Sequence, residues 1–195
     1  MAFISKAAKS AAAGGGGGKG GYLTAGKLGD GESHRIAILS EEALDYYTVW
    51  GEDAEGTKKP FRFAQEPTQE EIKQEMGDFK QRMNFEGTAL EKPKFAMAFF
   101  CWDYADEKVK IFEINQKTLI KELDGISQTE DYADLHAWDL VISRSGLKMA
   151  TEYKILPAPR KKGSQEVIDA AWSEAQESGY NINALMLGEN PFGES

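Results

Sequence analysis

The segment Lys94–Gln116, "KFAMAFFCWDYADEKVKIFEINQ", decides the fold class of this chain. Two apolar, aromatic-rich runs flank the polar break Ala105–Lys108, which predicts a β-hairpin with a four-residue loop. Successive side chains of a strand point to opposite faces of the sheet. One face of the first strand therefore carries Ala98, Phe100, Trp102 and Tyr104, and the other carries Phe95, Met97, Phe99 and Cys101. Both faces are apolar, whereas a strand covered on one side only would be polar on the other.

Further strands and helices are predicted on both sides of this hairpin. Strand patterns precede it at His34–Ser40, Leu44–Gly51 and Lys58–Ala64, the last with a proline, Pro60, that favours an edge position. A second hairpin follows, formed by "WDLVISR" (138–144) and "MATEYKIL" (149–156) around Ser145-Gly146. Helices are expected after the N-cap Thr68, within Asn115–Ser127 and over Ser164–Gly179.

The order strand, strand, long strand, helix, strand, strand is that of an OB-fold. We therefore expect a mainly β protein with helices, built on a five-stranded, partly open Greek-key barrel with a helix between strands 3 and 4. Three regions follow: a flexible Gly/Ala/Lys-rich arm (1–31), an OB-fold nucleic-acid-binding domain (32–160), and a C-terminal helix with an acidic tail (161–195). The barrel interior takes one face of the long strand, and the aromatic side chains left outside would form a platform.

Length and composition limit the class of protein. A chain of 195 residues with 41% hydrophobic residues fits one globular domain with tails. No apolar run approaches the roughly 18 residues of a membrane span, and the N-terminus lacks the apolar segment of a secretory signal. The single cysteine, Cys101, excludes a disulfide within the chain. We expect a soluble protein of a cytoplasm, without membrane contact.

The net charge of −9 is unevenly distributed along the chain. Residues 1–29 hold four lysines and no acid, and residues 163–195 hold six acids and no base. Residues 138–162 carry six basic residues against two acids. Because a ligand responds to the local field, the basic second hairpin remains compatible with a polyanionic ligand despite the negative total.

Aromatic side chains next to basic ones are what single-stranded nucleic acid needs, since unpaired bases stack on aromatic rings and phosphates contact Lys or Arg. The candidates for stacking are Trp50, Phe61, Phe63, Trp102, Tyr104 and Phe112. The candidates for phosphate contact are Arg35, Arg62, Lys94, Lys110, Arg144, Lys148 and Lys154. The alternative for each aromatic residue is a place in the core, because the sequence does not fix which face points inward.

Catalytic motifs are weak in this sequence. "GGGGGKGG" is no phosphate loop, because Lys19 is followed by Gly20 where Ser or Thr would bind Mg²⁺. The two histidines, His34 and His136, have no metal-ligand spacing, and Cys101 lies in a strand beside no evident base. We therefore expect no enzyme, no cofactor and no metal. A small metal-dependent nuclease stays open as a lesser alternative, with candidate acids Asp103, Asp106, Glu107, Glu130, Asp131 and Asp134.

The blocks "FAMAFFCWDYADEKVKIFEINQKTLIKEL" and "YADLHAWDLVISRSGLKMATEYKILPAPRK" resemble the OB-fold single-stranded DNA-binding proteins encoded by bacteriophages. In that group a "VKIFEI"-type strand leads into a helix, and a "DLVISRSG" strand and turn lead to a Thr-x-Tyr strand, here Thr151-Glu152-Tyr153. The resemblance covers about residues 33–160. It implies a DNA-binding protein that coats single-stranded DNA in phage DNA replication or DNA recombination, in the host cell cytoplasm. The zinc-binding Cys/His set of some phage relatives is lacking here.

Within the acidic C-terminal segment, Ser164–Gly179 is expected to be a helix packed on the barrel through Ile168 and Trp172. The tail Asn183–Ser195 is expected to compete with DNA for the cationic groove and, when displaced, to bind replication or recombination enzymes. Its candidate partner-binding residues are Glu189, Phe192 and Glu194. Truncation after Leu187 would then leave DNA affinity equal or higher and abolish stimulation of the partner enzymes. A second interpretation is an adaptor or structural protein whose β-barrel binds another protein through its aromatic surface. The oligomeric state is left open by the sequence.

Overall fold

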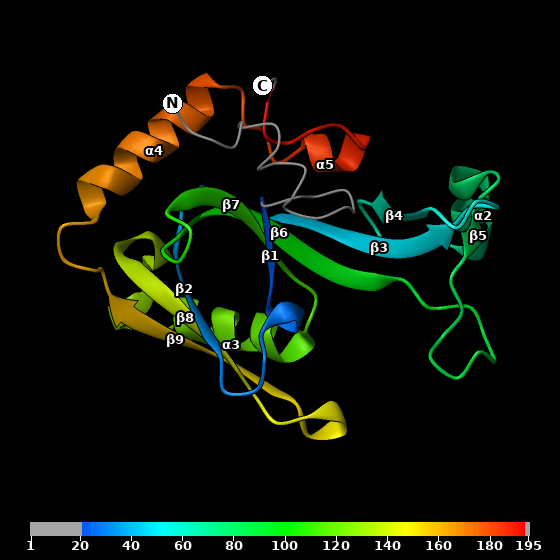
Figure 1. Cartoon of the computed structure of the whole chain (residues 1–195), viewed down its shortest axis with the longest axis horizontal. Helices are drawn as coiled ribbons and strands as arrows, with labels where there is room; N and C mark the ends of the chain where they lie inside the picture. The colour runs from blue at the N-terminus through cyan, green and yellow to red at the C-terminus, as the bar shows by residue number, and fades with distance from the viewer. Residues whose placement is uncertain (1–20, 194–195) are drawn as a thin grey trace, which may run out of the picture.

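The computed structural model describes residues 21–193, and these fold into one large sheet with helices on both of its faces (Figure 1). The strands are β1 (Tyr22–Thr24), β2 (Ser33–Ile38), β3 (Leu44–Glu52), β4 (Lys58–Phe63), β5 (Lys80–Gln81), β6 (Lys94–Asp103), β7 (Lys108–Ile114), β8 (Trp138–Ser145) and β9 (Glu152–Pro159). The α-helices are α2 (Gln69–Met76), α3 (Lys117–Ser127), α4 (Gln165–Glu177) and α5 (Ala184–Leu187). Short 3₁₀ turns lie at Ala25–Lys27, Glu130–Tyr132, Leu135–Ala137 and Lys148–Ala150.

The long strand β6 lies at the centre of the sheet. It pairs with β7 along one edge, while β3 and β2 share its other edge, from Thr48↔Lys94 to Ile36↔Asp103. The order continues through β8 to β9 on one side, and β1 runs parallel to β7 on the other. The predicted helix between the two hairpins is confirmed as α3. The sheet is open and has nine strands among the described residues, whereas the sequence predicts a five-stranded barrel.

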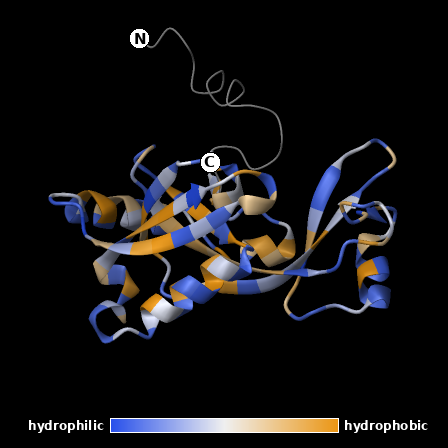
Figure 2. Cartoon of the chain, turned by 90° about the horizontal axis from the view of Figure 1, so that it is seen from below, coloured by the Kyte–Doolittle hydropathy of each residue, from blue (hydrophilic) through white to orange (hydrophobic). Residues whose placement is uncertain are grey.

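Both faces of β6 are buried, which explains its two apolar faces. Phe99 and Cys101 belong to a core that includes Leu119 and Leu123 of α3. On the opposite face, Ala98, Phe100 and Trp102 belong to a second core that α4 covers through Ile168 and Trp172, and that Tyr180 and Phe192 complete. Apolar residues accordingly concentrate in the central strands and in the inward sides of the helices, while peripheral loops are hydrophilic (Figure 2). The expectation of an exposed aromatic platform on this strand is therefore wrong, because the chain's own C-terminal segment covers it.

The segment between β3 and β6 forms an arm that projects from the main sheet (Figure 1). It consists of β4, α2 and β5, which are held by pairing with the far end of β3. The helix α2 begins as its sequence predicts, with a capping box in which Thr68 and Glu71 bond each other's backbone N–H groups. A small core of Val49, Phe61, Ile72 and Met76 packs the arm together.

Parts of the predicted N-terminal arm and C-terminal segment pack against the central sheet. Residues 22–24, which the sequence places in the arm 1–31, form β1, and Gly31 and Glu32 exchange backbone hydrogen bonds with Arg144. Residues 1–20 lie outside the described part of the chain. At the other end, α4 and α5 pack on the second core. No helix of residues 21–193 has the length and apolarity needed to cross a bilayer.

Candidate nucleic-acid interface

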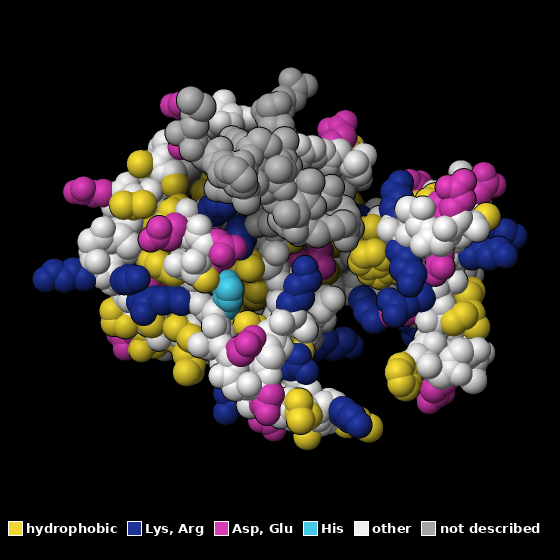
Figure 3. Space-filling view, in the orientation of Figure 1, with side chains coloured by type: hydrophobic (Ala, Val, Ile, Leu, Met, Phe, Trp, Pro, Cys, Tyr) yellow, Lys and Arg dark blue, Asp and Glu magenta, His cyan; other side chains and the backbone are white. Residues whose placement is uncertain are grey.

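A cleft of about 610 Å³ lies between the β3–β4 hairpin of the arm and the edge of the main sheet at β1 and β7. Its lining is Tyr22, Thr24, Lys27, Thr48, Trp50, Lys58, Lys59, Pro60, Arg62, Glu113, Leu185, Gly188 and Glu189. We refer to it as the basic cleft. Figure 3 shows Lys and Arg side chains gathered on the facing sides of the hollow between the arm and the rest of the molecule.

Strand register explains why these side chains meet. In the β3–β4 pair, Thr48 lies opposite Arg62, Trp50 opposite Pro60, and Glu52 opposite Lys58. Residues directly opposite each other share one face of the sheet, so this face of the hairpin carries an aromatic ring with a cation on each side. Trp50 is 39% exposed, which leaves its ring accessible from the cleft.

The cations of the basic cleft differ in how firmly they are held. Lys27, Lys58 and Lys59 are exposed, whereas Arg62 is half-buried, with its guanidinium 5.4 Å from the centre of the Tyr46 ring. The Nη1 of Arg62 donates to the Leu185 carbonyl oxygen at 3.5 Å, a long contact. The Nε of Arg62 and the Oγ1 of Thr48 are buried without a hydrogen-bond partner among the described residues. Buried polar atoms normally have a partner, so a water molecule or a polar group of a ligand would complete the hydrogen bonding of these two atoms.

A carboxylate lies in the floor of the cleft, beneath the ring of cations. The Tyr46 hydroxyl, which is fully buried, donates to Oε2 of Glu113 at 2.5 Å. Burial and then the adjacent Glu113 charge raise the pKa of Tyr46 well above its usual value, so this hydroxyl keeps its proton at neutral pH. Glu113 also lines a smaller adjoining cavity, together with Thr48, Trp50, Glu91, Lys94, Ala96 and Asn115. Lys94, which pairs with Glu91, therefore continues the line of cations beyond the cleft.

Of the residues predicted from the sequence, the structure brings Trp50, Arg62 and Lys94 together at this place. The cleft is also lined by Lys27, Lys58, Lys59 and Glu113, which are not among the residues predicted from the sequence. The alternation of positions 48, 50 and 52 against 58, 60 and 62 is the signal that would have found Lys58. Nothing in the sequence pattern indicates that β1 places Lys27 opposite the arm.

Four predicted contact residues are buried, and we correct their assignment. Phe61, Trp102 and Phe112 are 7%, 5% and 3% exposed, in the arm core, the second core and the first core respectively. Lys110 is 5% exposed, and its Nζ lies 2.7 Å from Asp103 Oδ2 and also contacts Asp106. None of the four reaches the surface in this fold. Phe63 is half-buried and packs against the arm core, so it does not line the cleft either.

Arg35 and Tyr104 belong to a structural cluster around the fully buried carboxylate of Asp139. The Nε of Arg35 donates to Asp139 Oδ2 at 2.7 Å, and the Tyr104 hydroxyl donates to Asp139 Oδ1 at 3.0 Å. Arg160 lies 3.2 Å from the same carboxylate, and the Tyr104 hydroxyl also contacts Ser164. This cluster fixes the linker that leads into α4. We therefore assign both residues to the fold, where the sequence predicts them at the nucleic-acid site.

The basic residues of the second hairpin lie apart from the cleft. Arg144 donates to the Leu28 carbonyl oxygen at 2.5 Å and lies 6.0 Å from the Tyr153 ring centre. Lys148, at the tip between β8 and β9, and Lys154 are exposed. None of the three lines the basic cleft. Their contact with phosphate stays a prediction for a longer strand that extends beyond the cleft.

The C-terminal residues are placed in different environments. Phe192 packs in the second core, with its ring centre 5.4 Å from those of Tyr22 and Tyr180. A Cβ on Gly21 would lie 2.4 Å from this ring, so the two segments are in close contact. Phe192 is therefore part of the packed fold, and its burial in a partner protein stays a prediction that requires the release of this segment. Glu189 is exposed and lines the basic cleft, and Glu194 lies outside the described residues.

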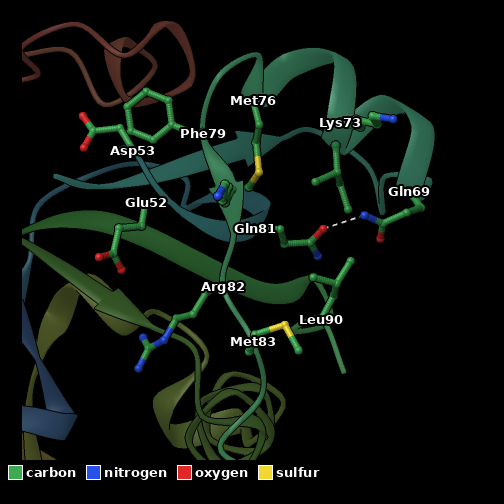
Figure 4. A pocket seen from close by; sticks show the side chains of 12 residues that line it. Glu52, Asp53, Gln69, Lys73, Met76, Phe79, Gln81, Arg82, Met83 and Leu90 are labelled. Atoms are coloured by element: carbon green, nitrogen blue, oxygen red, sulfur yellow. Dashed lines mark hydrogen bonds between the residues drawn. The ribbon is translucent and has the colours of Figure 1, made fainter. Parts of the chain in front are cut away.

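A second pocket, of about 670 Å³, lies on the arm between α2 and β5 (Figure 4). Its floor is apolar, with Ile72, Met76, Phe79, Met83 and Leu90, and polar side chains including Lys73, Gln81 and Arg82 surround it. The nearby Phe85 is fully exposed. This surface is suited to an apolar side chain of a partner protein, and it is separate from the cleft.

The groups that the sequence analysis considered for metal binding and nucleophilic attack have structural surroundings in the described residues. They contain no group of three or more His, Cys, Asp or Glu side chains arranged to hold a metal ion. His34 Nε2 donates to Asp103 Oδ1 at 2.9 Å, within the ion-pair network of Lys110. Burial raises the pKa of the Cys101 thiol, so the thiolate needed for nucleophilic attack is disfavoured.

Comparison with known proteins gives no relative from which a function could be transferred. No family model, no curated protein and no solved structure matches the chain. The site must therefore be interpreted from its own geometry.

Proposed function

We propose that the protein binds single-stranded DNA without enzymatic activity and coats it during bacteriophage replication or recombination. The observation that carries this proposal is the accessible Trp50 ring between Lys58 and Arg62 on one face of the β3–β4 pair, in one cleft. An unpaired base stacks on such a ring with about 1–3 kcal/mol, while lysines and arginines neutralise the phosphates that follow. The Trp50 ring would supply the stacking, and the cations on both sides of it would supply the phosphate contacts.

We also propose that the sheet is an elaborated OB-fold, the class to which the sequence resemblance points. The pairing of β2 with β6 and β8, of β6 with β7, and of β8 with β9 supports this, together with α3 between β7 and β8. In such folds oligonucleotides bind on the strand 2–3 face and the adjoining loops. The arm would then be an enlargement of the loop between the first and second strands, and it carries one wall of the cleft.

The test is fluorescence anisotropy with a labelled oligonucleotide, single-stranded against duplex of the same sequence. We expect the single strand to bind far more tightly, because a duplex keeps its bases stacked and hidden. Trp50→Ala should weaken binding by about 1–3 kcal/mol, whereas Trp50→Phe, which keeps a stacking ring, should retain most of the affinity. Equal affinity for duplex and single strand, or no effect of Trp50→Ala, would contradict the proposal.

A protein-binding adaptor is the second candidate function, and the arm pocket next to the exposed Phe85 favours it. Its apolar floor and polar rim have the anatomy of a protein interface. In this interpretation Phe85→Ala abolishes binding of the partner protein without changing DNA affinity. Retention of a partner by Phe85→Ala would oppose the adaptor, and loss of DNA affinity in that variant would place the arm loop in the DNA site.

A further inference from the structure

Resting on the single-strand binding proposed above, we infer that the carboxylate of Glu113 determines which way a nucleotide strand faces in the basic cleft and which bases the cleft accepts. Its Oε2 accepts the Tyr46 hydroxyl, and no hydrogen bond occupies its Oε1 among the described residues. No described cation lies within ion-pair distance of Glu113, although it lines the same cleft as Lys27, Lys58 and Arg62. The floor of the cleft is therefore a hydrogen-bond acceptor that carries negative charge, beneath a basic rim.

This arrangement excludes phosphates from the floor. A phosphate about 4 Å from a carboxylate meets a repulsion that grows as water is displaced. The exposed lysines of the rim, Lys27 on one wall and Lys58 on the other, offer the phosphates a favourable path. A strand in the cleft thus keeps its backbone along the rim and points a base edge toward Glu113, next to the stacking ring of Trp50.

An ionised carboxylate accepts hydrogen bonds and donates none. Cytosine and adenine present an exocyclic amino group, and guanine presents a ring N–H beside one, so each can donate to Glu113. Thymine and uracil present a single ring N–H between two carbonyl oxygens, and these oxygens face the carboxylate unfavourably. Glu113 therefore makes the cleft selective for bases with an exocyclic amino group over thymine and uracil.

The sharpest comparison uses oligo(dC) and oligo(dU) of about 12 nucleotides, a length within the site size of this class of domain. Both are weakly stacked pyrimidine strands of equal charge, and they differ at the Watson–Crick edge alone. At pH 7.5 and fixed salt, we expect oligo(dC) to bind at least about fivefold more tightly than oligo(dU). Glu113→Gln should reduce this ratio to about one, because an amide can donate to uracil and accept from cytosine while still accepting the Tyr46 hydroxyl.

Glu189→Gln is the matched control, since it removes the same charge from the wall of the cleft and leaves the floor intact. It should raise the affinity for both oligonucleotides alike and preserve their ratio. Equal binding of oligo(dC) and oligo(dU) by the unmodified protein overturns the inference while leaving single-strand binding in place. A ratio that persists in Glu113→Gln, or that falls equally in Glu189→Gln, also overturns it. Binding of neither oligonucleotide overturns the proposed function itself, and the inference with it.

Discussion

Removal of a single cation from the wall of the basic cleft should change the salt dependence of DNA binding by a calculable amount. Lys58 is exposed, and its ammonium makes a single ion pair among the described residues, with Glu52 at 4.0 Å, so Lys58→Gln leaves the packing of the arm intact. Four cations of the cleft and the cavity beside it can face a phosphate, namely Lys27, Lys58, Arg62 and Lys94, whereas the Lys59 ammonium lies 5.0 Å from the centre of the Phe61 ring in the arm core. For single strands the slope of log affinity against log salt is about −0.7 for each neutralised phosphate, so four contacts give about −2.8. Lys58→Gln should flatten this slope by about 0.7.

The assay is fluorescence anisotropy of a labelled oligonucleotide over a range of NaCl concentrations, at two strand lengths. A strand of about five nucleotides fills the cleft, and one of about 15 also extends toward the β8–β9 hairpin. Lys148→Gln, the control at the hairpin tip, should leave the slope unchanged with the short strand and flatten it by about 0.7 with the long one. An unchanged slope for Lys58→Gln with either strand would refute the cleft as the phosphate path. An equal effect of both variants on the short strand would show that DNA does not begin in the cleft.

Three further predictions concern the fold that forms the cleft. Ile168 lies in the fully buried contact of α4 with the sheet, so Ile168→Ala should lower the free energy of unfolding by about 2–5 kcal/mol in urea titrations. The control Val167→Ala, at an exposed position of the same helix, should change it by less than about 0.5 kcal/mol. Similar losses in both variants would contradict the packing of α4. Cys101 should resist alkylation by iodoacetamide at pH 8 until the protein is unfolded, because burial raises the pKa of its thiol, and rapid reaction of the native protein would disprove this. Burial opposes ionisation of Asp103, but the hydrogen bond from Lys110 and other favourable contacts outweigh burial and lower the pKa of Asp103. The ionised Asp103 therefore stabilises the fold above a pH of about 4, and this stabilisation is lost as the pH falls through the lowered pKa. Asp103→Asn should therefore destabilise the protein at pH 7 and have less effect at pH 3, and an equal effect at both would contradict the ion pair.

The sequence predicts the strands and helices of this fold better than it predicts which segments pack over each face of the sheet. Side-chain alternation placed the strands of the long hairpin, and the apolar spacing of Leu119 and Leu123 placed α3, because both are local patterns. The burial of Trp102 was missed because it depends on α4, more than 60 residues further along the chain, folding back over the sheet. Periodicity shows that both faces of a strand are apolar, but it does not show what covers each one.

The sequence predicts only part of the candidate site, because it shows residue types but not which distant residues they contact. Trp50, Arg62 and Lys94 were selected by residue type, and the pairing of β3 with β4 and β6 brings them together. Lys110 and Arg35 were selected on the same grounds, yet their partners are the buried acids Asp103 and Asp139. A basic residue in a strand is a phosphate contact or half of an internal ion pair, and the choice depends on acids that are distant in sequence.

The C-terminal segment connects the stability of the fold with the proposed site. Phe192 fills the second core against Tyr22 of β1, while Glu189, three residues earlier, lines the basic cleft. A truncation after Leu187 would remove both at once, so a loss of DNA affinity in that variant would report the uncovered core as much as the cleft. The charge of Glu189 can be removed without disturbing Phe192, and only such a change separates competition with phosphate from packing. The C-terminal segment that covers the second core thus also forms one wall of the cleft. DNA could displace the tail without exposing this core only if Phe192 stayed in place.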